Sequence, residues 1–146
     1  MNKTIKLFFD SDALIAGSAS KSGASFILLQ LCELGLIEGA ISNQVYKECS
    51  RNLSLKLPES KPFFTEIVRK SLLVINDPPE TEIKSFAKMA HSKDISILAA
   101  AEKWGADYLV TFNIKHYYPT DKIEVKISTP GKILQKIRML LNELSD

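Results

Sequence analysis

Residues 5–17, with the sequence IKLFFDSDALIAG, join an apolar run to a pair of carboxylates. Leu7, Phe8 and Phe9 form a nearly continuous apolar run, which is typical of a strand buried on both faces of a parallel sheet. Asp10 and Asp12 follow directly, before the chain turns apolar again. A buried charge costs free energy unless it is paired or bound to a metal, so this stretch predicts a partner for its carboxylates.

The amino-acid composition limits the classes of protein to which the chain can belong, without identifying one of them. The chain has 146 residues, of which 45% are apolar and 25% are charged, so we expect one globular domain over residues 1–146. The formal net charge of +2 argues against a strongly electrostatic partner such as bulk duplex DNA. Cys32 and Cys49 form neither a metal motif nor a disulfide framework, which favours a reducing compartment.

Hydropathy favours a cytoplasmic protein. Asp10 and Asp12 interrupt the only early apolar run, so we expect no signal peptide. No stretch approaches the roughly 20 apolar residues that a membrane helix needs, so we expect no membrane association.

Strand and helix signals alternate along the chain, which is the pattern of an α/β fold with a mainly parallel sheet. Strands are expected at 6–9, 36–42, 72–77, 106–112 and 122–127. A short helix is expected at 13–17, and longer helices at 22–35, 43–53, 63–71, 80–90, 93–105 and 130–144. Ser22 and Asn43 are the expected caps of the helices at 22–35 and 43–53. In open α/β sheets, ligands bind at the carboxyl ends of the strands, near the point where the strand order reverses.

Four side chains are candidates for a site at that edge of the sheet. Asp10 ends the first strand, and Asn113 follows the fourth. Glu48 lies at the margin of the apolar stripe of the helix at 43–53, and Asp94 heads the inward stripe of the helix at 93–105. Each has a structural alternative, which is capping for Asp10 and Asn113, solvation for Glu48 and a helix-dipole interaction for Asp94.

A cluster of carboxylates implies a cation. Two like charges ~4 Å apart repel by roughly 4 kcal/mol at an effective dielectric of about 20, so three need protonation or a bound ion. An oxygen-only donor set without histidine or thiolate fits a hard divalent ion, Mg²⁺ or Mn²⁺. The sequence therefore predicts that Asp10, Glu48 and Asp94 are metal ligands.

Three blocks of the sequence resemble the PIN-domain family of metal-dependent nucleases: FFDSDALIAG from residue 8, ISNQVYKE from residue 41 and KDISILAAAEKWGADYLVTFNIKHY from residue 93. The resemblance runs over residues 6–132, and the last block is its most specific part. It implies a three-layer α/β/α fold with a central four- or five-stranded, mainly parallel sheet. It also implies hydrolysis of RNA phosphodiester bonds by acids in a shallow groove.

Carried over by position, the three acids of the family fall on Asp10, Glu48 and Asp94, and its fourth polar position falls on Asn113. Many members carry aspartate at the fourth position, so this chain has one negative charge fewer there. Many small members are toxins of toxin–antitoxin pairs, and many dimerise. The resemblance therefore implies RNA as substrate, an antitoxin protein as partner and a homodimer.

Other residues are expected around these four. Two residues are expected to support the site: Asp12, at a position where the family often has asparagine, and Thr111, the hydroxyl at the end of the fourth strand. Capping of the helix that follows is the alternative for Asp12. Four basic residues are expected to flank the groove and contact RNA phosphates, with a solvated surface role as the alternative: Lys21, Lys47, Arg51 and Lys115. His116, a lone histidine in a turn, is interpreted as structural, with assistance in proton transfer as the alternative, and His91 is given no role.

Two other classes of protein fit part of the sequence. The segment DSDAL after an apolar strand resembles the opening of haloacid-dehalogenase-type phosphatases, but the strand at 106–112 runs into TFNIKHY without the acidic pair that those enzymes need. A PIN-fold protein that binds nucleic acid with little or no turnover fits Asn113 and the low net charge. Metal-dependent cleavage that requires Asp10 distinguishes a nuclease from such a binding protein.

Overall fold

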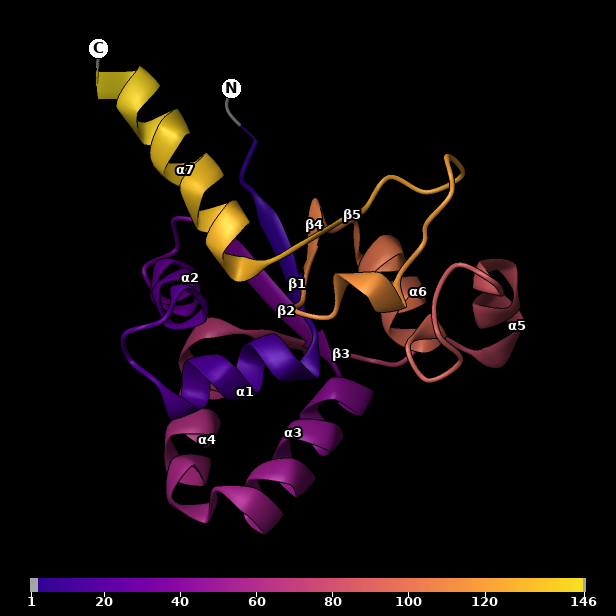
Figure 1. Ribbon diagram of the computed structural model, residues 1–146, viewed down its shortest axis with the longest axis horizontal. Helices are drawn as coiled ribbons and strands as arrows, with labels where there is room; N and C mark the ends of the chain where they lie inside the picture. Colours follow the sequence, from indigo (N-terminus) through magenta and orange to yellow (C-terminus); the bar gives the residue numbers. More distant parts are fainter. Residues whose placement is uncertain (1–2, 146) are drawn as a thin grey trace.

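The computed structural model describes residues 3–145 and has a central sheet between two layers of helices (Figure 1). The strands are β1 (Lys6–Phe9), β2 (Glu38–Ser42), β3 (Leu73–Ile75), β4 (Tyr108–Val110) and β5 (Lys126–Ser128). The α-helices are α1 (Ser11–Ala19), α2 (Ala24–Glu33), α3 (Asn43–Lys56), α4 (Lys61–Ser71), α5 (Glu80–Ile83), α6 (Ile95–Trp104) and α7 (Pro130–Ser145). Short 3-10 helices occupy Pro58–Ser60, Lys84–Phe86 and Ile114–His116.

The sheet has the strand order β3-β2-β1-β4-β5, and every neighbouring pair is parallel. Leu7 of β1 is in register with Gly39 of β2 on one side and with Tyr108 of β4 on the other. The chain leaves β1 toward β2 and leaves β4 toward β5, so the strand order reverses between β1 and β4. The predicted α/β fold is thus confirmed, and the ligand crevice of such a sheet lies at the carboxyl ends of these two strands.

The apolar run of β1 is buried because helices cover both faces of the sheet. Leu7, Phe8 and Phe9 are fully buried. In Figure 1, α1, α2 and α7 lie on one side of the sheet, and α5 and α6 lie on the other. The central strand is therefore held on both faces, which fixes the position of Asp10 directly after it.

Two sequence-based assignments of elements are wrong. The helix expected at 80–90 stops after a 3-10 turn at Lys84–Phe86, because Lys88 has a φ of 71° and Ala90 forms an antiparallel bridge with Tyr117. That long-range pairing overrides the local helical preference. Ser42, and not Asn43, caps α3, since the hydroxyl of Ser42 accepts the N–H of Val45 at 3.3 Å.

The remaining differences concern the ends of elements. At the start of α2, Gly23 and not Ser22 occupies the capping position, and no side chain caps that helix. The expected loop after residue 53 is partly helical, since α3 continues to Lys56. Within residues 3–145, each helix is either too short or too polar to cross a membrane.

Candidate active site

A groove of about 670 Å³ opens at the end of the sheet where β1 and β4 finish. It is lined by Asp10, Ser11, Asp12, Ile15, Glu48, Asn52, His91, Ser92, Lys93, Asp94, Asn113, His116 and Tyr118. The structure thus brings the four residues predicted for the site to one groove, although they belong to four separate parts of the chain. Thr111 is fully buried beside Asp10, to which its hydroxyl donates a hydrogen bond.

Asp10 is the most enclosed acid of the groove, with 6% of its surface exposed. Its Oδ1 accepts the N–H of Ser11 at 2.8 Å, which caps α1. Its Oδ2 accepts the hydroxyls of Thr111 at 3.0 Å and Tyr117 at 2.8 Å. Burial, followed by the negative charge of Asp12, raises the pKa of Asp10 to about 6. A positive charge in the groove would therefore stabilise its ionised form.

Asp12 connects the start of α1 to the end of β4. Its Oδ1 accepts the N–H of Ala13 at 2.7 Å, and its Oδ2 accepts the N–H of Phe112 at 2.9 Å. The hydroxyl of Thr111 also lies 3.2 Å from its Oδ1. Burial raises the pKa of Asp12. These contacts hold the first turn of α1 against the chain just after β4, which is compatible with the supporting role predicted for Asp12.

Glu48 is held in the groove by hydrogen bonds to both carboxylate oxygens. Its Oε2 accepts the hydroxyl of Ser11 at 2.5 Å, and its Oε1 accepts the side-chain amide of Gln44 at 3.0 Å. The same amide donates to the carbonyl of Lys93 at 3.3 Å, while the hydroxyl of Ser96 donates to Oε1 of Gln44. Gln44 therefore links the predicted ligand on α3 to the start of α6.

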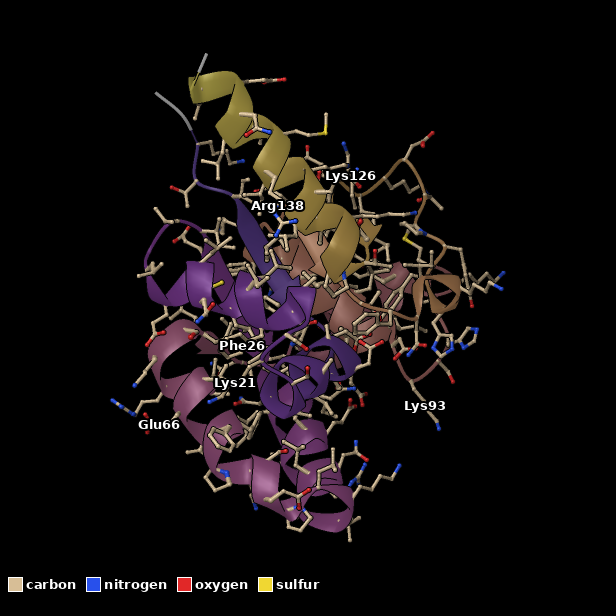
Figure 2. The ribbon with its side chains drawn as sticks, turned by 60° about the vertical axis from the view of Figure 1, so that its left-hand side comes forward. Lys21, Phe26, Glu66, Lys93, Lys126 and Arg138 are labelled. Carbon is tan, nitrogen blue, oxygen red and sulfur yellow. The ribbon has the colours of Figure 1, made fainter. Side chains whose placement is uncertain are left out.

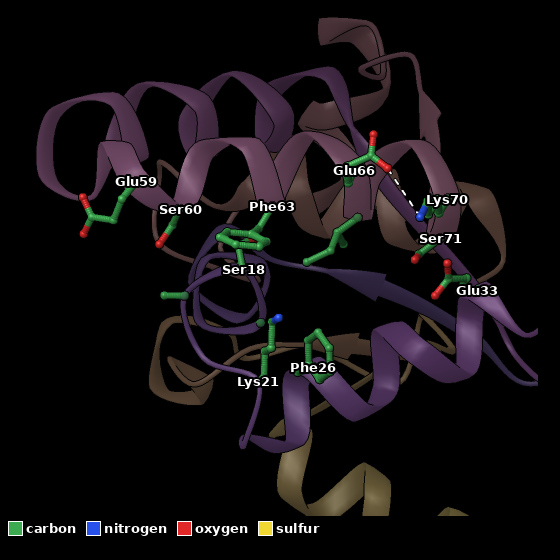
Figure 3. Close-up of a pocket in the computed structure, with 13 residues that line it drawn as sticks. Ser18, Lys21, Phe26, Glu33, Glu59, Ser60, Phe63, Glu66, Lys70 and Ser71 are labelled. Atoms are coloured by element: carbon green, nitrogen blue, oxygen red, sulfur yellow. Dashed lines mark ion pairs between the residues drawn. The ribbon is translucent and has the colours of Figure 1, made fainter.

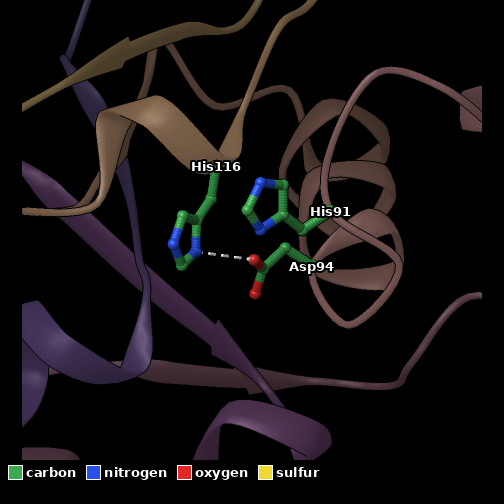
Figure 4. A group of neighbouring side chains, drawn as sticks. All are labelled: His91, Asp94 and His116. Carbon is green, nitrogen blue, oxygen red and sulfur yellow. Dashed lines mark hydrogen bonds and ion pairs between the residues drawn. The ribbon is translucent and has the colours of Figure 1, made fainter.

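Asp94 and Asn113 are not engaged in capping. Asp94 directly precedes α6, yet its side chain makes no capping hydrogen bond to that helix. Its Oδ2 instead lies 3.2 Å from Nδ1 of His116 (Figure 4). Asn113 precedes the 3-10 helix at Ile114–His116 and likewise makes no side-chain cap. Local capping therefore does not account for either residue.

The donor chemistry of the groove fits a hard divalent cation. Asp10, Glu48 and Asp94 offer only carboxylate oxygens, and the burial that raises the pKa of Asp10 is the kind of penalty that a cation offsets. Within residues 3–145 these three acids do not form a group whose ligand atoms all lie within 4.8 Å of one another. Their looser spacing suits Mg²⁺, which keeps several waters and takes one or two carboxylates directly.

The predicted phosphate-binding residues lie in different places. Lys47 and Arg51 are exposed on α3, and Lys115 is exposed in the turn after β4. Lys21, by contrast, lines a separate cavity of about 320 Å³ beside α2 and α4, with Nζ 5.3 Å from the ring centroid of Phe63 (Figure 3). Figure 2 shows Lys21 well apart from Lys93, a lysine that does line the acidic groove.

Several residues that line the groove or support its acids have no assigned role in the sequence-based prediction. Tyr117 gives no local signal, because its hydrogen bond to Asp10 joins positions 107 apart in the chain. Lys93 and Gln44 have the sequence pattern of ordinary polar residues on a helix, so nothing local distinguishes them. His91 stands three positions before Asp94. This spacing can place both side chains on one side of a turn, and it is the sequence signal that points to His91 as a groove residue.

Comparison with known proteins identifies the family. A family model described as the PIN domain matches residues 6–115. The chain therefore belongs to the PIN-domain family, as the three sequence blocks predicted. This assignment excludes the haloacid-dehalogenase alternative. A search of curated proteins found no match to the sequence.

Solved structures share the fold at low sequence identity. The VapBC2 structure from Rickettsia felis, bound to a DNA fragment from its promoter, has a TM-score of 0.63 and 17% identity, covering 85% of this chain and 99% of that one. PAE2754 from Pyrobaculum aerophilum has a TM-score of 0.66 and 17% identity, with coverages of 92% and 96%. VapC20 of Mycobacterium tuberculosis, described as a sarcin-ricin loop cleaving toxin, has a TM-score of 0.54 and 15% identity, with coverages of 75% and 92%.

Proposed function

We propose that this protein is a divalent-metal-dependent ribonuclease that hydrolyses RNA phosphodiester bonds. The observation that carries the proposal is the meeting of Asp10, Glu48 and Asp94 in one groove, at the reversal of strand order. Such a crevice is where open α/β sheets bind their ligands. Membership of the PIN-domain family supports nuclease activity.

In this proposal, Asp10, Glu48 and Asp94 hold Mg²⁺ or Mn²⁺, and Asn113 offers a neutral oxygen beside them. When bound, the cation supplies positive charge against the phosphate oxygens and makes water more acidic. The chain itself keeps the acids oriented. Tyr117 and Thr111 donate to Asp10, and Ser11 donates to Glu48.

Basic side chains near the groove would contact the RNA backbone. Lys93 lines the groove, while Lys47, Arg51 and Lys115 are exposed on neighbouring elements. Phosphate contacts of this kind position a nucleic acid without reading its sequence.

The test is incubation of single-stranded RNA with the protein and Mn²⁺, beside the Asp10→Asn and Asp94→Asn variants and an EDTA control. Cleavage by the wild-type protein alone supports the proposal. If RNA binds equally to all three proteins and none cleaves it, the alternative of a PIN-fold binding protein replaces the nuclease.

We further propose that the protein is the toxin of a toxin–antitoxin pair and forms a homodimer. Two proteins of similar fold are VapBC2 and the VapC20 toxin, which supports the first part. An apolar groove of about 630 Å³ beside α7, with Leu140, Leu141 and Leu144 exposed, supports a protein partner. Light scattering of the protein alone, and with the product of the neighbouring gene, tests both parts.

A further inference from the structure

His91 and His116 are held face to face by backbone pairing. Ala90 and Tyr117 form an antiparallel bridge, which places His91 directly opposite His116. The N–H of His91 donates to the carbonyl of His116 at 2.8 Å. Opposite residues of an antiparallel pair project from the same face. The two imidazole rings accordingly stack, with centroids 4.2 Å apart and planes 20° apart (Figure 4).

A turn brings a carboxylate to the same place. The N–H of Asp94 donates to the carbonyl of His91 at 2.8 Å, which folds the HSKD segment back on itself. The carboxylate of Asp94 then lies 3.2 Å from Nδ1 of His116. Within the described part of the chain, these are the three metal-ligating side chains whose donor atoms all lie within 4.8 Å of one another.

We propose that His91, Asp94 and His116 form a binding site for a borderline divalent transition metal such as Zn²⁺, which shares Asp94 with the oxygen-only Mg²⁺ or Mn²⁺ site but adds two nitrogen ligands. Two imidazoles and one carboxylate are the donors that Zn²⁺, Co²⁺ and Ni²⁺ prefer, whereas Mg²⁺ prefers oxygen alone. Three protein ligands leave a fourth position open toward the groove, as in zinc sites that keep an exchangeable ligand.

The geometry is compatible with one ion. Zn–N and Zn–O bonds of about 2.1 Å in a tetrahedral site correspond to donor atoms about 3.4 Å apart. Imidazole lone pairs lie in the ring plane, so both rings must turn about their Cβ–Cγ bonds to point at a common ion. His91 is exposed and the side chain of His116 is 42% exposed, which leaves room for that rotation and for entry of the ion.

The electrostatic surroundings favour a cation at this place. Asp10, Asp12 and Glu48 line the same groove and carry negative charge when ionised. Lys93 also lines that groove, and its side chain is exposed. Asp94 belongs to both donor sets. The two sites therefore share a ligand, and an ion bound by the histidines changes the groove that the proposed nuclease uses.

The test measures metal binding directly and does not depend on RNA cleavage. Zn²⁺ affinity is measured by calorimetry in excess Mg²⁺, and the visible absorption of Co²⁺ reports nitrogen ligands. We expect one Zn²⁺ per chain, with affinity weakened more than about 100-fold in the His91→Ala and His116→Ala variants, because even an outer-shell partner contributes 10–100-fold. The Asn52→Ala variant, which alters a neutral side chain of the same groove, is the matched control and keeps the wild-type affinity.

Two further variants separate this site from the acidic one. Asp10→Asn and Glu48→Gln are expected to retain Zn²⁺ binding even if they abolish cleavage, so failure of the nuclease proposal leaves this one intact. Thermal unfolding without metal checks that each histidine variant is folded, and His116→Gln provides a second, more conservative substitution. Three results would overturn the proposal: no Zn²⁺ binding, displacement of Zn²⁺ by Mg²⁺, or Zn²⁺ binding by a variant that lacks both histidines.

Discussion

The hydroxyl of Tyr117 donates a 2.8 Å hydrogen bond to Oδ2 of Asp10, and both residues are buried. The Tyr117→Phe variant removes that donor and leaves the carboxylate less well satisfied. Hydrogen bonds to charged groups contribute about 1.5–3 kcal/mol, so we expect the free energy of unfolding to fall by that amount at neutral pH. Urea denaturation measures it, with Tyr118→Phe on the exposed rim of the groove as the control. Equal losses in the two variants would contradict the assignment.

The burial of Asp10 makes stability depend on pH. Its pKa is about 6 in the folded protein, against 3.8 for an unperturbed aspartate, so the folded state holds the proton more tightly. The resulting stabilisation is fully present below about pH 4 and is lost as the pH rises through about 6, amounting to about 3 kcal/mol. Relative to Asp10→Asn, wild-type stability should therefore fall across this range. Parallel pH curves for the two proteins would refute the prediction.

Divalent cations should reverse that loss. A metal ion needs the deprotonated acid, so Mn²⁺ should raise the unfolding temperature more at about pH 7.5 than at about pH 5. At a Mn²⁺ concentration 100 times the Kd, the expected stabilisation is about 2.7 kcal/mol. Calorimetric melting of the wild-type protein, with Asp10→Asn as control, provides the measurement. A shift that is independent of both pH and Asp10 would place the cation elsewhere.

The short hydrogen bond from Ser11 to Glu48 predicts a metal-dependent defect. Ser11→Ala releases Oε2 of Glu48, which the hydroxyl contacts at 2.5 Å. Loss of such an orienting contact typically weakens metal affinity by about 10–100-fold, so the Mn²⁺ concentration for half-maximal RNA cleavage should rise by that factor. Ser92→Ala alters another serine of the same groove and should leave the half-maximal Mn²⁺ concentration unchanged. A drop in the maximal rate alone would indicate a different role for Ser11.

The two lysines Lys93 and Lys21 should differ in their effect on RNA binding. Lys93 lines the acidic groove, whereas Lys21 lines the separate cavity near Phe63. Lys93→Ala should weaken RNA binding and reduce the slope of log K against log salt by about 0.7, the value for one phosphate contact on a single strand. Lys21→Ala should have no such effect. Both lysine variants are made in the catalytically inactive Asp10→Asn protein. Filter binding of RNA to each at several salt concentrations then tests the two expectations.

The sequence predicts the scaffold well because its strongest signal is local. The apolar run at Leu7, Phe8 and Phe9 belongs to a strand whose burial on both faces requires helices on each side. Asp10 directly follows β1, and Asp94 directly precedes α6, a helix that begins at the same edge of the sheet. The topology rule for the carboxyl ends of strands therefore brings both residues to one groove. Hydrophobic periodicity and the residues at the ends of helices and strands are therefore enough to predict the scaffold and the position of these two acids.

The missed parts depend on pairing between distant segments. Ala90 and Tyr117 form their bridge across a segment that contains α6 and β4, and no periodic pattern announces it. That bridge ends the expected helix early, turns Tyr117 inward to Asp10 and sets the two histidines opposite each other. One unpredicted contact therefore accounts for most of what sequence reasoning could not find in the groove.

The 107 positions between Asp10 and Tyr117 also bear on when the groove can form during synthesis. A ribosome that has just translated residue 100 has already made Asp10, Glu48 and Asp94, but neither β4 nor the tyrosine that packs behind the first acid. Contacts so far apart are formed late, because closing a long loop is entropically unfavourable. A nascent chain of this protein therefore carries its acids unassembled until Tyr117 has been translated.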